Sequence, residues 1–78
     1  MSRLTKRERE VVKLLSQGRR QTEIARLLTI STRTVEHHVK SARDKTGTTS
    51  AFQLAVRAAL QDQVNKAKLK MKVAVEAA

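Results

Sequence analysis

The sequence has 78 residues, which is the size of one small domain. It contains no cysteine and no proline, two glycines and a single aromatic residue, which excludes a disulfide scaffold, a thiolate metal site and an aromatic platform for stacked bases. The formal net charge of +10 favours a polyanionic partner, with nucleic acid first and an anionic membrane surface second.

The first predicted element is a helix over about residues 6–17. Thr5 and Glu8 fit the capping-box pattern, in which a hydroxyl at the N-cap is followed three residues later by a carboxylate. The apolar residues that recur at helical spacing are Val11, Val12, Leu14 and Leu15. Gly18 then supplies a residue that accepts the left-handed backbone at a helix end.

A second, short helix is predicted over residues 21–28. Glu23 lies in its first turn, where the helix dipole favours a negative charge. Its expected buried face consists of Ile24, Ala25, Leu27 and Leu28. Residues 28–31 form a tight turn in this prediction, and Ile30 fills the angle between the two flanking helices.

Ser31 is a good N-cap and opens a third helix that is predicted to end near Gly47. One face repeats at i, i+3, i+4 and i+7 and is expected to point inward: Val35, His38, Val39 and Ala42. The other face is polar and mostly basic: Arg33, Glu36, His37, Lys40, Arg43 and Asp44. Such an outer face suits a helix that lies in a major groove.

Residues 48–50 offer another N-cap, and a fourth helix is predicted from Ala51 to about Leu60. Beyond it, heptad spacing continues through Leu60, Val64, Ala67, Met71, Ala74 and Ala78. Residues 66–73 also alternate lysine with apolar residues, as a strand or a basic tail does, but their helix-favouring composition predicts a continued or frayed helix. The chain thus divides into a domain over residues 1–60 and a basic extension over residues 61–78.

The order of these segments predicts an all-α, four-helix fold that contains a helix-turn-helix. Two helices joined by a tight turn, the second presenting polar side chains, form the motif that reads double-stranded DNA. A basic helical bundle with a solvated face is the alternative without a function. The concentration of charge on the outer face of the third helix favours the DNA reader.

Several short motifs are spread over about residues 4–60. They are residues 4–12, Gly18, residues 23–25, Leu28, residues 30–31, residues 34–35, His38, Lys45 and Gly47. In this order and spacing they resemble the LuxR/FixJ-type, or GerE-like, DNA-binding domain of bacterial transcription regulators. The resemblance implies a homodimer on an inverted repeat, with the second and third helices reading DNA and the fourth pairing two copies. Arg20, Glu36, Thr46 and Ala51 depart from the residues that are common in that family.

The resemblance and the charge pattern together predict three sets of contact residues. By position, the resemblance implies base reading by Glu36, His37 and Lys40, and the outer face adds Arg43. A carboxylate can accept from the amino group of cytosine, and lysine can donate to guanine. Contacts to phosphate are expected from Arg19, Arg20, Gln21, Thr22, Thr32, Arg33, Thr34 and Lys45, although helix capping alone also explains hydroxyls at such places. The expected dimer contact consists of Phe52, Leu54, Ala55, Ala58 and Ala59.

No catalytic, metal or cofactor site is expected. Adjacent helical residues point about 100° apart, so His37 and His38 cannot easily share one ion. We expect His38 to pack half-buried and His37 to face the groove. No apolar run approaches the roughly 18 residues of a membrane span, and the first residues lack a signal peptide's apolar core, so a cytoplasmic protein is expected.

Two further functions remain open from the sequence. The chain could be an interaction protein that heterodimerises with a larger regulator and removes it from DNA. It could also act like region four of a sigma factor, which reads DNA while bound to RNA polymerase. Residues 34–38 are less similar to that second group.

Overall fold

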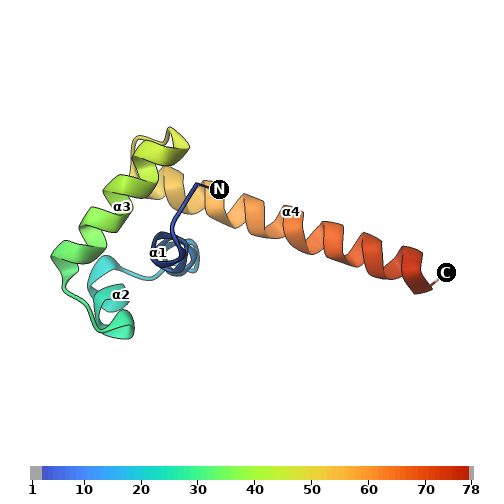
Figure 1. Ribbon diagram of the computed structural model, residues 1–78, viewed down its shortest axis with the longest axis horizontal. Helices are drawn as coiled ribbons and strands as arrows, with labels where there is room; N and C mark the ends of the chain where they lie inside the picture. The colour runs from blue at the N-terminus through green and yellow to red at the C-terminus, as the bar shows by residue number, and fades with distance from the viewer. Residues whose placement is uncertain (1–2, 78) are drawn as a thin grey trace.

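The computed structural model describes the backbone of residues 3–77 and the side chains of residues 3–67. Its helices are α1 (Lys6–Ser16), α2 (Gln21–Leu28), α3 (Thr32–Thr46) and α4 (Ala51–Ala77). The first three helices and the beginning of α4 pack together, and the remainder of α4 projects away from them (Figure 1). The predicted all-α fold with four helices is confirmed.

Both ends of α1 form as the sequence predicts. The Thr5 hydroxyl accepts from the N–H of Glu8 at 3.1 Å, and the Glu8 carboxylate accepts from the N–H of Thr5 at 2.8 Å. At the other end, Gly18 has a φ of +84°, and the N–H of Arg19 donates to the carbonyl of Leu14 at 3.1 Å. This left-handed turn satisfies carbonyls that the end of the helix leaves unpaired.

Every helix contributes to one apolar core. Its buried residues are Leu4, Val11, Val12, Ile24, Ala25, Val35, Val39, Ala42, Leu54 and Ala58. The prediction that Leu27 belongs to this core was wrong, because its side chain is 54% exposed. With about 100° between successive residues, Leu27 lies about 60° beyond Ile24, at the edge of the face that contains Ile24, Leu28 and Ala25.

The fourth helix is the longest of the described helices. The Ser50 hydroxyl caps its start by accepting from the N–H of Gln53 at 3.1 Å, and the helix then runs without interruption to Ala77. The predicted helical continuation is therefore confirmed, while the side chains of Met71 and Ala74 and the whole of Ala78 lie outside the described residues. None of the helices that are described is both long and apolar enough to cross a membrane.

A buried ion pair joins the first turn of α1 to the last turn of α3. The ammonium of Lys45 lies 2.7 Å from the carboxylate of Glu8, whose side chain is only 5% exposed. Burial by itself raises the pKa of Glu8, but hydrogen bonds from the side chains of Lys45 and Ser41 and from the N–H of Thr5 outweigh it and lower that pKa to about 2. The carboxylate is therefore ionised wherever the chain is folded near neutral pH.

This lowered pKa predicts a specific loss of stability in acid. Above pH 4.5 the contribution of Glu8 is fully present, and as the pH falls from 4.5 to about 2 the unfolded chain binds a proton first. We expect the free energy of unfolding of the parent chain to fall by about 3 kcal/mol more than that of Glu8→Gln over this interval. Denaturant titrations followed by circular dichroism at several pH values measure the difference.

The matched control is Glu10→Gln, which removes a carboxylate that pairs with Arg7 at the surface of the same helix. This variant keeps the acid dependence of the parent, because surface ion pairs contribute little to stability. Parallel pH profiles for the parent and Glu8→Gln would contradict the assigned role of Glu8.

Candidate nucleic-acid interface

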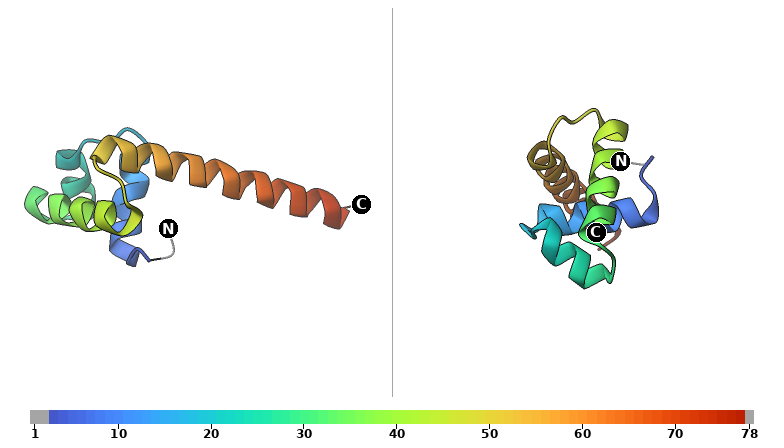
Figure 2. Two further views of the ribbon diagram at one scale, coloured as in Figure 1. Left: turned by 90° about the horizontal axis from the view of Figure 1, so that it is seen from above. Right: turned by 90° about the vertical axis from the view of Figure 1, so that its left-hand side faces the viewer.

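The third helix has one buried and one exposed face. Val35 and Ala42 are 0% exposed and Val39 is 3% exposed, so the inner face is fixed against the core. Glu36, His37 and Lys40, from the predicted base-reading set, are exposed on the opposite side. Figures 1 and 2 show α3 at the end of the molecule away from the free end of α4.

The two histidines divide between these faces as predicted. His37 is exposed and His38 is half-buried. Their ring centroids lie 6.4 Å apart with the planes tilted by 60°. His37 therefore belongs to the outer face with Glu36 and Lys40, whereas His38 helps to pack the helix.

The turn between α2 and α3 fixes the position at which α3 begins. Thr29 adopts the left-handed backbone with a φ of 57°, a conformation that costs a β-branched residue about 1–3 kcal/mol. The turn is held because the N–H of Ile30 donates to the carbonyl of Ala25 at 2.9 Å and the Ile30 side chain packs on the core. Ser31 then caps α3 by accepting from the N–H of Thr34 at 3.1 Å.

The residues predicted to contact phosphate gather around the beginnings of α2 and α3. A shallow hollow joins the two helices and is lined by Thr22, Ala25, Arg26, Thr29, Ile30, Ser31 and Thr32. Arg19, Arg20, Arg33 and Thr34 are exposed nearby in sequence, and Gln21 is half-buried. The Thr34 hydroxyl shares a hydrogen bond of 2.8 Å with Ser31, so capping already uses it.

Arg26 is a cation of this hollow that the sequence prediction missed. It lies one turn after Thr22, and this i+4 spacing was the available signal.

Arg43 lies on the same side of α3 as Glu36, seven residues after it, but its side chain is not fully exposed there. It is half-buried, and its guanidinium donates to the carbonyl of Thr49 at 3.2 Å. The hydrogen bond ties α3 to the loop that leads into α4. The reason is that the chain reverses directly after Gly47, which brings the loop back over the last turns of α3.

Lys45 also differs from its predicted placement as a cation free to bind phosphate. Its ammonium is engaged by Glu8, as described above, and 34% of its side chain remains exposed. Glu8 lies 37 positions earlier in the chain, so no local sequence pattern predicted this pair.

The predicted dimer residues fall on two different sides of α4. Leu54 is 0% exposed and Ala58 is 6% exposed, so both belong to the core and were wrongly assigned to a contact between copies. Ala55 and Ala59 are half-buried, and only Phe52 of that set is widely exposed, at 77%. Leu54 lies on the side of α4 that packs against α1 and α3, and its side chain fills the core there.

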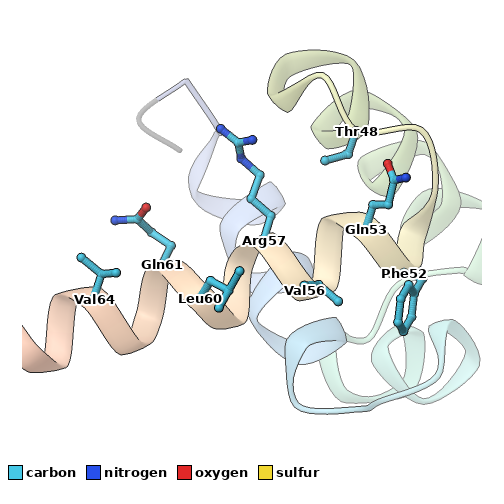
Figure 3. A pocket seen from close by; sticks show the side chains of 8 residues that line it. All are labelled: Thr48, Phe52, Gln53, Val56, Arg57, Leu60, Gln61 and Val64. Atoms are coloured by element: carbon cyan, nitrogen blue, oxygen red, sulfur yellow. The ribbon is translucent and has the colours of Figure 1, made fainter.

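Among the side chains of α4 that the structure describes, the large exposed apolar ones form a separate row at a spacing of four. This row, called here the α4 stripe, consists of Phe52, Val56, Leu60 and Val64. It lines a shallow groove with Thr48, Gln53, Arg57 and Gln61, and Figure 3 shows that all of these except Thr48 project from α4 itself. The spacing from Phe52 onward was the signal that identifies the stripe in the sequence.

Comparisons with known proteins agree with this arrangement. Residues 2–58 match the family described as "GerE: Bacterial regulatory proteins, luxR family". The chain is 47% identical over 53 residues to the spore germination protein GerE of Bacillus subtilis, covering 68% of this chain and 72% of that protein. It is 46% identical over 59 residues to the transcriptional activator protein BjaR1 of Bradyrhizobium diazoefficiens, and there it spans 24% of the relative's length.

The two basic residues Lys45 and Arg19 should respond differently to removal. Lys45→Met leaves the buried Glu8 without its cation, so we expect a loss of about 1–3 kcal/mol in the free energy of unfolding and an unchanged salt dependence of DNA binding. Arg19→Ala removes an exposed cation whose pairing with Glu23 spans 3.5 Å, so stability should change by less than about 0.5 kcal/mol.

Binding of Arg19→Ala to a duplex of random sequence should weaken, and the slope of log affinity against log salt should flatten by roughly one unit. Fluorescence anisotropy at several salt concentrations measures this slope for both variants. If the slope of log affinity against log salt also flattens for a fully folded Lys45→Met, Lys45 contacts phosphate as the sequence predicts.

Proposed function

The chain belongs to the luxR family of bacterial regulatory proteins, and we propose that it is a transcription regulator that binds specific sequences of double-stranded DNA as a homodimer. The observation that carries this proposal is the exposed polar face of α3 on a helix whose other face is completely buried. A helix held in this way can enter the major groove without exposing any of the core.

The dimensions and chemistry of α3 suit the major groove. Its 15 residues span about 22 Å, and a groove about 12 Å wide accommodates one helix with its side chains. Lys40 presents an ammonium donor for the guanine acceptors, and Glu36 presents a carboxylate acceptor for an exposed base amino group. With His37 these residues are the proposed base-reading set, while the contacts of Arg43 favour a structural role for it.

The backbone of DNA is proposed to lie over the beginnings of α2 and α3. The hollow lined by Thr22, Arg26 and Thr32 offers hydroxyl and guanidinium donors beside the N-terminus of α3. A helix N-terminus favours an anion through its free N–H groups and its dipole. Arg19, Arg20 and Arg33 extend the positive field around this hollow and supply attraction that does not depend on sequence.

The α4 stripe supports pairing of two copies. Phe52 and Leu60 are 77% and 59% exposed, and an apolar row of this length is unusual on a surface that water alone covers. Residues spaced by four form a ridge inclined to the helix axis, so two such ridges interlock when the helices cross at about −50°. The stripe lies on the same rigid helix that contributes Leu54 to the core, which couples pairing to the position of α3.

A symmetric pair of copies is proposed to bind an inverted repeat. Two recognition helices related by a two-fold axis contact half-sites about 34 Å apart, or a multiple of that distance. The same stripe can receive the fourth helix of a larger member of the family. An interaction protein that removes such a regulator from DNA is therefore the second candidate.

Base reading is tested by Lys40→Ala. Loss of the ammonium donor should weaken binding to the selected site by about 5- to 150-fold and leave binding to random duplex within about 2-fold to 3-fold of the parent. Lys66→Ala is the matched control, because it removes an exposed lysine of α4 that pairs with Asp62 at 3.2 Å and lies outside α3. Equal affinities of the parent and Lys40→Ala for the specific site would reject this face as the base-reading surface.

Pairing is tested by Leu60→Glu, which places a charge in the α4 stripe without touching the core. We expect the parent to sediment as a dimer and the variant as a monomer, with the affinity for an inverted repeat lowered roughly 100-fold or more. Affinity for a single half-site should be unchanged.

Gln63→Glu adds the same charge to α4 outside the stripe and should leave the dimer intact. A parent chain that is monomeric and makes no footprint by itself, yet captures a larger family member, would favour the second candidate over the first.

A further inference from the structure

Glu36 and Asp44, the two exposed acidic residues of α3, differ from the other acidic residues on the described surface, because neither forms an ion pair there; Asp44 lies near the end of the helix, whereas Glu36 lies beside His37 and Lys40 on the outer face. Glu10 pairs with Arg7, Glu23 with Arg19 and Asp62 with Lys66, each through a cation three or four residues away on the same helix or just before it. Among the described side chains, no ion pair or hydrogen bond involves the carboxylate of Glu36. It nevertheless lies between Arg33 and Lys40, at spacings from which either cation could reach it.

An exposed carboxylate is unfavourable on a surface that approaches DNA. Each phosphate repels it, and so do the acceptors that guanine and thymine present in the major groove. Only the amino groups of cytosine and adenine donate hydrogen bonds there. Of these two bases, adenine also presents the N7 acceptor beside its amino group, so cytosine is the base that a carboxylate accepts without a neighbouring repulsion.

We propose that Glu36 is the specificity-determining residue that selects cytosine at one position of each half-site and rejects guanine and thymine there. This inference rests on the proposed function, because it requires α3 to lie in the major groove. It deepens that proposal by stating which base one side chain chooses. The carboxylate lowers the affinity for DNA of any sequence, and it makes the affinity differ between sequences.

The position of Lys40 predicts a second base of the half-site and its distance from the first. Residues i and i+4 are separated by about 6 Å along a helix, and stacked base pairs by about 3.4 Å. Lys40 is therefore expected to read a guanine within about two base-pair steps of the cytosine read by Glu36. The half-site should contain these two bases at a constant separation.

The test is selection from random duplex DNA with the full chain and two variants of one residue. The parent should enrich cytosine at the position of Glu36. Glu36→Gln should enrich adenine, whose N6 and N7 atoms an amide can bond together, and Glu36→Lys should enrich guanine. The guanine assigned to Lys40 and the other letters of the motif should stay the same in all three selections.

An affinity measurement gives the size of the effect. For the parent, changing the selected cytosine to thymine, or the pair to its reverse, should weaken binding by about 5- to 150-fold. Asp44→Asn is the matched control, since it removes another exposed carboxylate of α3 near the end of the helix. It should raise affinity for random duplex as Glu36→Gln does but enrich the motif of the parent.

The outcomes separate this inference from the proposed function. If the parent enriches a motif and all three proteins share every letter of it, Glu36 does not select a base and the inference is overturned while the DNA-binding function stands. If Asp44→Asn changes the same letter, the effect is one of net charge and the inference is also overturned. A parent that enriches no motif overturns the proposed sequence-specific function itself.

Discussion

The burial of one face of α3 is the constraint on which the rest of the structure depends. Val35, Val39 and Ala42 leave almost no apolar surface open, so the helix can neither rotate nor lift without exposing the core. The ion pair between Lys45 and Glu8 then holds its last turn to the first turn of α1. Because a buried carboxylate that loses its cation is strongly unfavourable, this contact favours one position of α3 over neighbouring ones. These contacts therefore fix the direction in which the exposed face of α3 points.

The fourth helix has two apolar faces, one in the core and one at the surface. Leu54 and Ala58 complete the core beneath α1 and α3, while the α4 stripe remains outside it. In the proposed pair of copies, this one helix would connect the contact between the copies to the position of each α3. Its continuation to Ala77 carries the same element well beyond residues 2–58, which are the part that matches the family.

Local features of the sequence were sufficient for most of the fold. The capping box of Thr5 and Glu8, the left-handed glycines and the spacing of Val35, Val39 and Ala42 act within a few residues of one another, and the helices begin and end where these signals place them. The exposure of Glu36, His37 and Lys40 followed from the same periodicity. Contacts outside the helix were not foreseen: Lys45 pairs with Glu8, 37 residues earlier in the chain, and Arg43 bonds to the loop that follows α3.

The sequence by itself thus determined which residues are helical and which face of α3 is polar, because both depend on periodicity and capping over short distances. The resemblance to the family came separately, from motifs that keep their order and spacing along the chain. Only the tertiary structure decided that Lys45 pairs with Glu8, and that Leu54 fills the core while Phe52 does not. These choices depend on which surfaces of separate helices meet. Two faces of α4 are similarly apolar, and only packing against α1 and α3 distinguishes the one that is buried.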